Sequence, residues 1–441
     1  MNTRAGVYLT TVAVLAGLAT HGTYAGSGDE PHYLAIAHSI AFDHDLDLSN
    51  NYGAAEPLIG GGQLHPEMHA QPGRGGILRP AHDIGMPLLF APYIRVARPI
   101  SAAIAADMEP SLMARLHLTP SVLYRQTISA AMIALAGVLT LVFFDVCLRI
   151  GMSERRAVWT TLLMALSPPL LIFSILFFTE MVSALLVLAI FRLIVVVQGP
   201  SRTWEWGAAG LATGFLVLVH TRNVMLAATL GALAIWTLLQ RGEHRRLILF
   251  GSAAMAMLAI RTFVIHEFWG TWITTPLAKV GEWPGAMRFL SIVAGRSAGL
   301  AIDQEYGLLL TAPVFVVGVF GAVALARTRP RVMSGIAIVA GGYVTSLVLP
   351  LTNPVGWTGG WSPAARFLVP IVPLVAIAVA AGLRAAPRSI VTLLLVAQVG
   401  IDAYVWQHPK IVWSNGRGEA AVCDRLAVNI CAFLPSFIKT P

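Results

Sequence analysis

Long apolar runs, separated by short polar turns that contain arginine, follow one another along most of the chain. A membrane-spanning helix needs about 20 apolar residues to cross about 30 Å of hydrocarbon. This pattern predicts about eleven such helices. They lie near residues 6–24, 126–149, 157–174, 179–197, 205–220, 223–240, 247–268, 308–326, 332–351, 366–383 and 389–406. The short helix at 205–220 is expected to be tilted or only partly inserted. The expected fold class is an all-α polytopic membrane protein.

Composition supports this interpretation. The chain has 441 residues, of which 56% are hydrophobic and 12% charged, whereas a soluble domain carries about 25% charged residues. A soluble globule of this composition would expose large apolar patches, and a disordered chain would leave too much apolar surface in water. A membrane β-barrel is disfavoured because its strands alternate apolar and polar residues, whereas the apolar runs here are continuous.

The net charge of +8 reflects arginines that recur at one end of the predicted helices. No basic run with interleaved aromatic residues occurs, so we do not expect nucleic-acid binding. Under the positive-inside rule the arginine-rich turns are cytoplasmic, which places the N-terminus inside and the C-terminus outside. The turns concerned contain Arg4, Arg149, Arg155, Arg156, Arg202, Arg241, Arg245, Arg246, Arg327, Arg329, Arg331, Arg384 and Arg388.

This orientation depends on the segment 84–105, which is apolar but is interrupted by two arginines and by prolines. We interpret it as a helix lying on the outer membrane surface, because a full crossing would reverse every later turn. One transmembrane domain then covers 1–406, with a first outer loop at 25–125 that holds membrane-surface amphipathic helices and a second at 269–307. Residues 407–441 form a short extracytoplasmic tail. The first apolar run is also compatible with a cleaved signal peptide.

Cysteine and histidine usage leaves two questions open. Cys423 and Cys431 can form a disulfide if the tail lies in an oxidising compartment, and Cys147 is expected to be an inert packing residue. The early part of the chain is rich in histidine, but the spacing matches no standard metal-binding signature. Solvated histidines are the favoured interpretation, and a divalent metal is permitted but not required. The seven early histidines are His21, His32, His38, His44, His65, His69 and His82.

The sequence GDEPHY places Asp29 and Glu30 directly after the first predicted span, at the start of a predicted amphipathic helix. Acidic residues at a helix start are also explained by the helix dipole alone. Glu180 begins another span, and Arg222 and Arg366 lie on the side that the charge rule normally depletes of arginine. Such an arginine can snorkel to the interface or can bind an anionic phosphate. Two further carboxylates, in the sequence DQEYG, either cap a helix or face the same side: Asp303 and Glu305.

These features together resemble the membrane-embedded GT-C glycosyltransferases that use polyprenyl-phosphate sugars, such as the protein O-mannosyltransferases and the bacterial enzymes that add aminoarabinose to lipid A. The resemblance rests on GDEPHY after the first span, on SPPLLIFSILFFTEMVSALL at 167–186, and on RFLVPIVPLVA at 366–376. It is strongest over 1–200 and returns at 300–380. The extended C-terminal soluble domain of some members is missing from this sequence.

The resemblance implies a residue-by-residue mechanism. Asp29 would be the general base that takes the acceptor hydroxyl proton in one inverting displacement, and Glu30 would orient the acceptor or the base, or help to hold a metal. Arg366, with Arg222 as the second choice, would bind the donor phosphate. The remaining residues expected to contact substrate are His32, Tyr33, His82, Glu180, Asp303 and Glu305.

The resemblance also implies a polyprenyl-phosphate-linked sugar as donor, an unknown glycan, lipid or protein acceptor, and contact with membrane lipids. The expected location is a bacterial-type cytoplasmic membrane, with the active site on the extracytoplasmic side. A transporter or flippase of a lipid-linked saccharide is the alternative function, and a non-catalytic scaffold is a third. A transporter site near the bilayer midplane is disfavoured because the interior of the spans has few ionisable residues.

Overall fold

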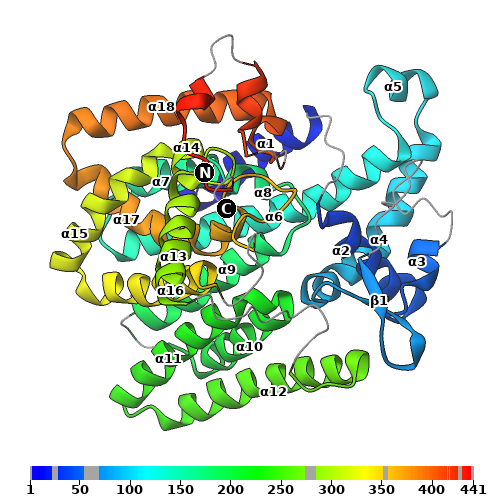
Figure 1. Ribbon diagram of the computed structural model, residues 1–441, viewed down its shortest axis with the longest axis horizontal. Coiled ribbons are helices and arrows are strands. Elements are labelled where there is room, and N and C mark those ends of the chain that lie inside the picture. Colours follow the sequence, from blue (N-terminus) through cyan, green and yellow to red (C-terminus); the bar gives the residue numbers. More distant parts are fainter. Residues whose placement is uncertain are drawn as a thin grey trace.

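The computed structural model describes residues 2–21, 28–53, 69–197, 199, 201–273, 285–350, 356–414, 416, 418–425 and 430–438. Helices account for nearly all of its regular structure (Figure 1). The first half of the chain contains α1 (Thr3–His21), α2 (Glu30–His38), α3 (Ser49–Gly53), α4 (Gly85–Asp107), α5 (Pro110–Arg115), α6 (Pro120–Arg149), α7 (Glu154–Ala165), α8 (Leu170–Phe173), α9 (Thr179–Phe191) and α10 (Thr203–Val219). The second half contains α11 (Val224–Gln240), α12 (His244–Trp269), α13 (Ala286–Ile302), α14 (Leu308–Thr311), α15 (Gly318–Thr328), α16 (Pro330–Val348), α17 (Val372–Ala385) and α18 (Arg388–Gln407).

Within the described residues, nine helices are long and apolar enough to cross a membrane, so the protein is a helical polytopic membrane protein. Eight of them match predicted spans, and the ninth is α4, the segment that we expected on the membrane surface. By length and composition α4 qualifies as a span, and its surface location stays a prediction. The segment expected to be short, 205–220, forms the 17-residue helix α10.

Two predicted spans are not continuous helices. The span expected at 157–174 ends with α7, passes through the cis Pro168–Pro169 bond and resumes as the four-residue α8. The span expected at 308–326 divides into α14, a 3-10 turn at Pro313–Val317 and α15. Proline explains both breaks, since it lacks the backbone N–H that an uninterrupted helix needs. The predicted count of about eleven spans is therefore not confirmed at these segments.

The segment after the first span also differs from expectation. We predicted an amphipathic helix on the membrane surface, but all nine residues of α2 are buried. It packs against α4, and Figure 1 shows α2, α3 and a short β-hairpin gathered beside α4 at one end of the molecule. The hairpin pairs β1 (Ala70–Pro72) with β2 (Leu78–Pro80) in antiparallel register, Ala70 opposite Pro80. This hairpin brings the residues just outside its two ends close together.

The largest hydrophobic core surrounds α6, α9 and α17. Helix α9 is buried along most of its length, because its neighbours α6, α10 and the 3-10 turn Arg366–Ile371 all pack on it. A helix that is apolar all round is expected at such a central position. The start of α9 and the start of the Arg366 segment therefore meet inside the protein rather than at its surface.

Candidate active site

Arg366 lies at the centre of the candidate site, with its guanidinium held between two carboxylates. Its Nε donates to Glu180 Oε1 at 2.7 Å, one Nη donates to Asp29 Oδ2 at 2.5 Å, and the other donates to the Gly359 carbonyl at 3.1 Å. The Phe178 ring lies 4.5 Å from the guanidinium carbon. The side chain is only 4% exposed, so the protein supplies all the charge compensation that this cation needs.

The loop before Arg366 is shaped to aim this side chain inward. Ala365 adopts a left-handed conformation, with φ of 58°, which is uncommon for a residue with a Cβ. The C-terminal tail supports the loop, because the Ala364 N–H donates to the Val412 carbonyl and the Ser414 N–H to the Ser362 carbonyl. The segment that we expected as a short extracytoplasmic tail is thus part of the framework of the site.

Asp29 reaches Arg366 because the residue before it is glycine. Gly28 has φ of +60°, and a Cβ there would lie 2.4 Å from the Trp361 carbonyl oxygen, so no other residue fits without a shift. The Asp29 side chain remains 22% exposed. Burial raises its pKa, but the charge and hydrogen bond of Arg366, together with the neighbouring His82 and His220, outweigh burial, and the net pKa lies well below the ordinary value. Asp29 is therefore ionised at neutral pH and open to a ligand.

Glu30 points elsewhere. Its Oε1 accepts a hydrogen bond at 2.6 Å from the backbone N–H of Phe177, in the loop that leads into α9. Glu30 is only 8% exposed. The two adjacent acids therefore have different partners. Asp29 binds Arg366, whereas Glu30 holds the loop that leads to Phe178 and Glu180.

Arg222 approaches the same site from the turn Thr221–Asn223 between α10 and α11. Its guanidinium carbon lies 3.2 Å from the centre of the Phe367 ring, and the Arg366 guanidinium lies 5.5 Å from the same ring. Among the residues that the structure describes, no carboxylate forms an ion pair with Arg222. Arg222 is half-buried, and its charge is not already matched by a carboxylate in the described part of the chain.

The turn that carries Arg222 is fastened by Asp83. The carboxylate accepts hydrogen bonds from the Thr221 N–H at 2.7 Å and from its hydroxyl at 2.9 Å, and it lies 3.7 Å from His220. Burial raises the pKa of Asp83, and these hydrogen bonds only partly oppose the rise. Asn223 binds Ser183 of α9 from the other side of the turn at 2.8 Å. Arg222 is consequently positioned relative to the same helix that carries Glu180.

A group of histidines lies next to the second carboxylate oxygen of Asp29, Oδ1, which does not bind Arg366. His69 and His82 flank the β-hairpin, and His69 Nδ1 lies 2.9 Å from His82 Nε2, which in turn lies 4.0 Å from Asp29 Oδ1. The His32 ring stacks on His69 with a centroid distance of 3.8 Å, and Tyr33 lies 5.0 Å from the ring of His82. Burial lowers the pKa of His82 to about 4, although the negative charge of Asp29 opposes this.

A divalent metal fits one part of this cluster. The donor atoms of Asp29, His69 and His82 all lie within 4.8 Å of one another. Two imidazoles and a carboxylate are a donor set that zinc and similar ions accept, with a position left for another ligand. The direct contact between the two imidazole nitrogens also fits an N–H···N hydrogen bond. His65, another of the early histidines, lies outside the described residues.

Asp303 and Glu305 bind backbone rather than facing the arginines. Asp303 accepts hydrogen bonds from the Glu305 and Tyr306 N–H groups, both at 2.9 Å, and from that of Phe437 at 2.7 Å. Glu305 accepts from the N–H groups of Gly416 and Gly418. Both carboxylates thus attach the C-terminal tail to the end of α13. Cys423 of this tail is disulfide-bonded, and the side chain of Cys431 lies outside the described residues.

The structure brings together most of the residues that the sequence analysis singled out. Asp29, Glu180, Arg222 and Arg366 converge, with His32, Tyr33 and His82 beside Asp29. Sequence reasoning missed Asp83, His220, Asn223 and Phe367, which position these side chains. The only local signal for Asp83 was its place next to His82. The partners of the other three depend on contacts between distant segments.

Comparison with known proteins returned a structural likeness only. No family model matches the chain, and no curated protein does. The chain is similar to the crystal structure of ArnT from Cupriavidus metallidurans bound to undecaprenyl phosphate, a GT-C glycosyltransferase. The sequence identity is 13% and the TM-score 0.47. The match covers 92% of this chain and 65% of that one, so this chain spans less than two thirds of its length.

Proposed function

We propose that this protein is a membrane glycosyltransferase that moves a sugar from a polyprenyl-phosphate donor to an acceptor hydroxyl. The observation that carries the proposal is the pairing of an accessible, ionised carboxylate, Asp29, with a nearby arginine that has no carboxylate partner in the described structure, Arg222. A glycosyl transfer from a phosphate needs a proton acceptor on one side of the anomeric carbon and a cation for the leaving group on the other.

Asp29 is the proposed general base. The acceptor oxygen bonds to the anomeric carbon while the bond from that carbon to the phosphate oxygen breaks, and the hydroxyl proton passes to Asp29. The lowered pKa of Asp29 suits this role, because the transition state resembles an oxocarbenium ion and the attacking oxygen becomes strongly acidic as its bond forms. A weak base is then sufficient. One displacement of this kind inverts the anomeric centre.

Arg222 is the proposed ligand of the donor phosphate. The phosphate gains negative charge as the glycosidic bond breaks, and a guanidinium can meet two of its oxygens at once. Sequence reasoning ranked Arg366 first for this role, but its guanidinium is already occupied by Glu180, Asp29 and Gly359. We therefore assign Arg366 to positioning Asp29, with Glu180 as its second anchor.

We further propose that the site opens on the extracytoplasmic side of a bacterial-type cytoplasmic membrane, with the N-terminus inside. The arginine-rich turns lie at the opposite ends of the helices, which supports this orientation under the positive-inside rule. A lipid-linked donor suits such a site because its polyprenyl chain stays in the bilayer.

Asp29→Asn is the decisive test against the alternative of a lipid-linked saccharide transporter. The variant keeps the shape of the side chain but removes its basicity, so sugar transfer should fall by about 10²–10⁴-fold. Release of polyprenyl phosphate from a panel of polyprenyl-phosphate sugars measures it, with solubilised membranes as the source of acceptor. Binding of the donor should remain. Because Asp29→Asn also removes a carboxylate partner of Arg366, its thermal stability should fall about as much as that of Glu180→Gln, which removes the other carboxylate partner. Undiminished sugar release, or transport of the intact donor by the variant, would contradict the proposal.

A divalent cation is the alternative partner for Oδ1 of Asp29, because His69 and His82 complete a three-donor group with it. Such an ion would supply positive charge beside Asp29 and would make this carboxylate a ligand instead of a base. Elemental analysis distinguishes the two cases without any activity measurement. About one retained metal ion per chain, lost in a His69→Ala, His82→Ala double variant, would support the ion. No retained metal in the wild-type protein would leave Asp29 as the base.

A further inference from the structure

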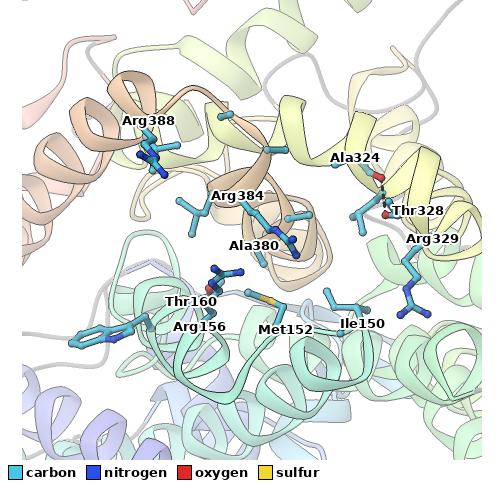
Figure 2. A pocket seen from close by; sticks show the side chains of 18 of the residues that line it. Ile150, Met152, Arg156, Thr160, Ala324, Thr328, Arg329, Ala380, Arg384 and Arg388 are labelled. Atoms are coloured by element: carbon cyan, nitrogen blue, oxygen red, sulfur yellow. Dashed lines mark hydrogen bonds between the residues drawn. The ribbon is translucent and has the colours of Figure 1, made fainter.

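A cavity lies far from Asp29, where three helical turns meet. It has a volume of about 830 Å³ and is bordered by the turn between α6 and α7, the end of α15 and the turn between α17 and α18 (Figure 2). Much of its wall is apolar, formed by side chains that include Ile150, Met152, Leu325, Leu383 and Val391. The cavity is large enough to receive a lipid headgroup together with the first part of its acyl chains.

Four arginines give this cavity its charge: Arg156, Arg329, Arg384 and Arg388. Figure 2 shows Arg156 and Arg384 extending into the middle of the cavity, with the other two near its edges. No aspartate or glutamate lines it. Within the described part of the chain, none of the four guanidinium groups forms an ion pair or a side-chain hydrogen bond. Four cations face an apolar cavity without a protein anion to balance them.

The cavity lies at the opposite end of a membrane-spanning segment from the candidate active site. Arg366 begins the 20-residue apolar segment Arg366–Ala385, and Arg384 lies one residue before its end. Twenty helical residues rise about 30 Å, which is the thickness of the hydrocarbon core. Trp159 lines the cavity and is 66% exposed, as is usual for a tryptophan at the level of the lipid headgroups. The arginines therefore lie at the opposite membrane surface, where headgroups of lipids are available.

We propose that this cavity binds the headgroup of an anionic glycerophospholipid. The phosphate would lie between Arg156 and Arg384, which can each donate two parallel hydrogen bonds, and the acyl chains would follow the apolar wall into the bilayer. A soluble anion would satisfy the arginines but would leave the apolar wall and the exposed Trp159 uncovered. The site is separate from the sugar-transfer chemistry, so this proposal does not depend on the proposed function.

Native mass spectrometry of the delipidated full-length protein tests the proposal, with phosphatidylglycerol and phosphatidylcholine as probes. We expect the wild-type protein to bind phosphatidylglycerol at least about tenfold more tightly than phosphatidylcholine, and an Arg156→Gln, Arg384→Gln double variant to lose that preference. Glycerol 3-phosphate at millimolar concentration should not displace the lipid, because it lacks the apolar part.

The matched control is Arg155→Gln, Arg327→Gln, which removes the same charge from neighbouring exposed positions that do not line the cavity. It should bind phosphatidylglycerol as the wild-type protein does. All substituted side chains are exposed, so a thermal melt should show both double variants folded. Equal binding of the two lipids by the wild-type protein, equal losses in the two double variants, or full displacement by glycerol 3-phosphate would overturn the proposal.

Discussion

Arg222→Gln tests the assignment of the donor phosphate most directly. The variant removes a guanidinium that no described carboxylate neutralises, and it leaves the contacts between Arg366, Glu180 and Asp29 untouched. Because no ion pair is broken, no buried carboxylate loses its partner, and the free energy of unfolding should change little. The effect should appear in catalysis instead.

The size of the effect follows from the contact that is lost. Removing one preorganised donor to a developing negative charge costs about 2.7–4 kcal/mol in other enzymes. At 1.36 kcal/mol for each factor of ten, turnover should fall by about 10²–10³-fold. Arg222 is half-buried and stacked 3.2 Å from the Phe367 ring, so its geometry is fixed before substrate arrives. Arg222→Lys keeps the charge but not the fork or the stacking, and should lie between the wild-type protein and Arg222→Gln.

Two measurements separate this reasoning from a structural effect. Release of polyprenyl phosphate from the labelled donor gives turnover, and binding of polyprenyl phosphate itself gives an affinity that needs no acceptor. Arg222→Gln should impair both, whereas Arg245→Gln, at an exposed position, should impair neither. Turnover of Arg222→Gln within about threefold of the wild type would refute the assignment, because threefold corresponds to less than 1 kcal/mol.

Three further predictions concern stability. Glu180→Gln removes one of the two carboxylates that hold buried Arg366. The free energy of unfolding, measured by chemical denaturation, should therefore fall by about 2 kcal/mol, and sugar transfer, measured by the transfer assay, should decline as well. Asp303→Asn weakens three backbone hydrogen bonds and should lower the thermal midpoint of unfolding. The KM for the donor should nevertheless stay within about twofold of the wild-type value, and a large rise in KM would indicate that Asp303 contacts the substrate after all. Burial lowers the pKa of His38 to about 3, so its stabilising contribution is complete above pH 6.5 and is lost at about 1.4 kcal/mol for each pH unit as the pH falls toward 3. Thermal melts between pH 7.5 and pH 5 should therefore fall more steeply for the wild type than for His38→Asn, and equal slopes would contradict the prediction.

Several features of the protein are readable from local sequence. Long apolar runs predicted a helical membrane protein, and eight of the nine candidate spans lie where those runs are. Asp29, Glu180, Arg222 and Arg366 were also selected from sequence, because a charged residue at the mouth of an apolar run is unusual and costly unless it has a partner. These inferences succeed because hydropathy and charge at helix ends are properties of short segments.

The partners of these charged residues needed the folded chain. Nothing near Arg366 in the sequence shows that its guanidinium is occupied by the carboxylates of Asp29 and Glu180. Nor does it show that no carboxylate in the described part of the chain pairs with Arg222. Similarly, the sequence around Asp303 suggests a carboxylate of the substrate site. In the folded chain the C-terminal tail returns to this residue, and the backbone N–H of Phe437 donates a hydrogen bond to it. Which cation is free and which is neutralised depends on distances between segments that are remote in sequence, and electrostatic energy changes steeply with those distances in a buried site.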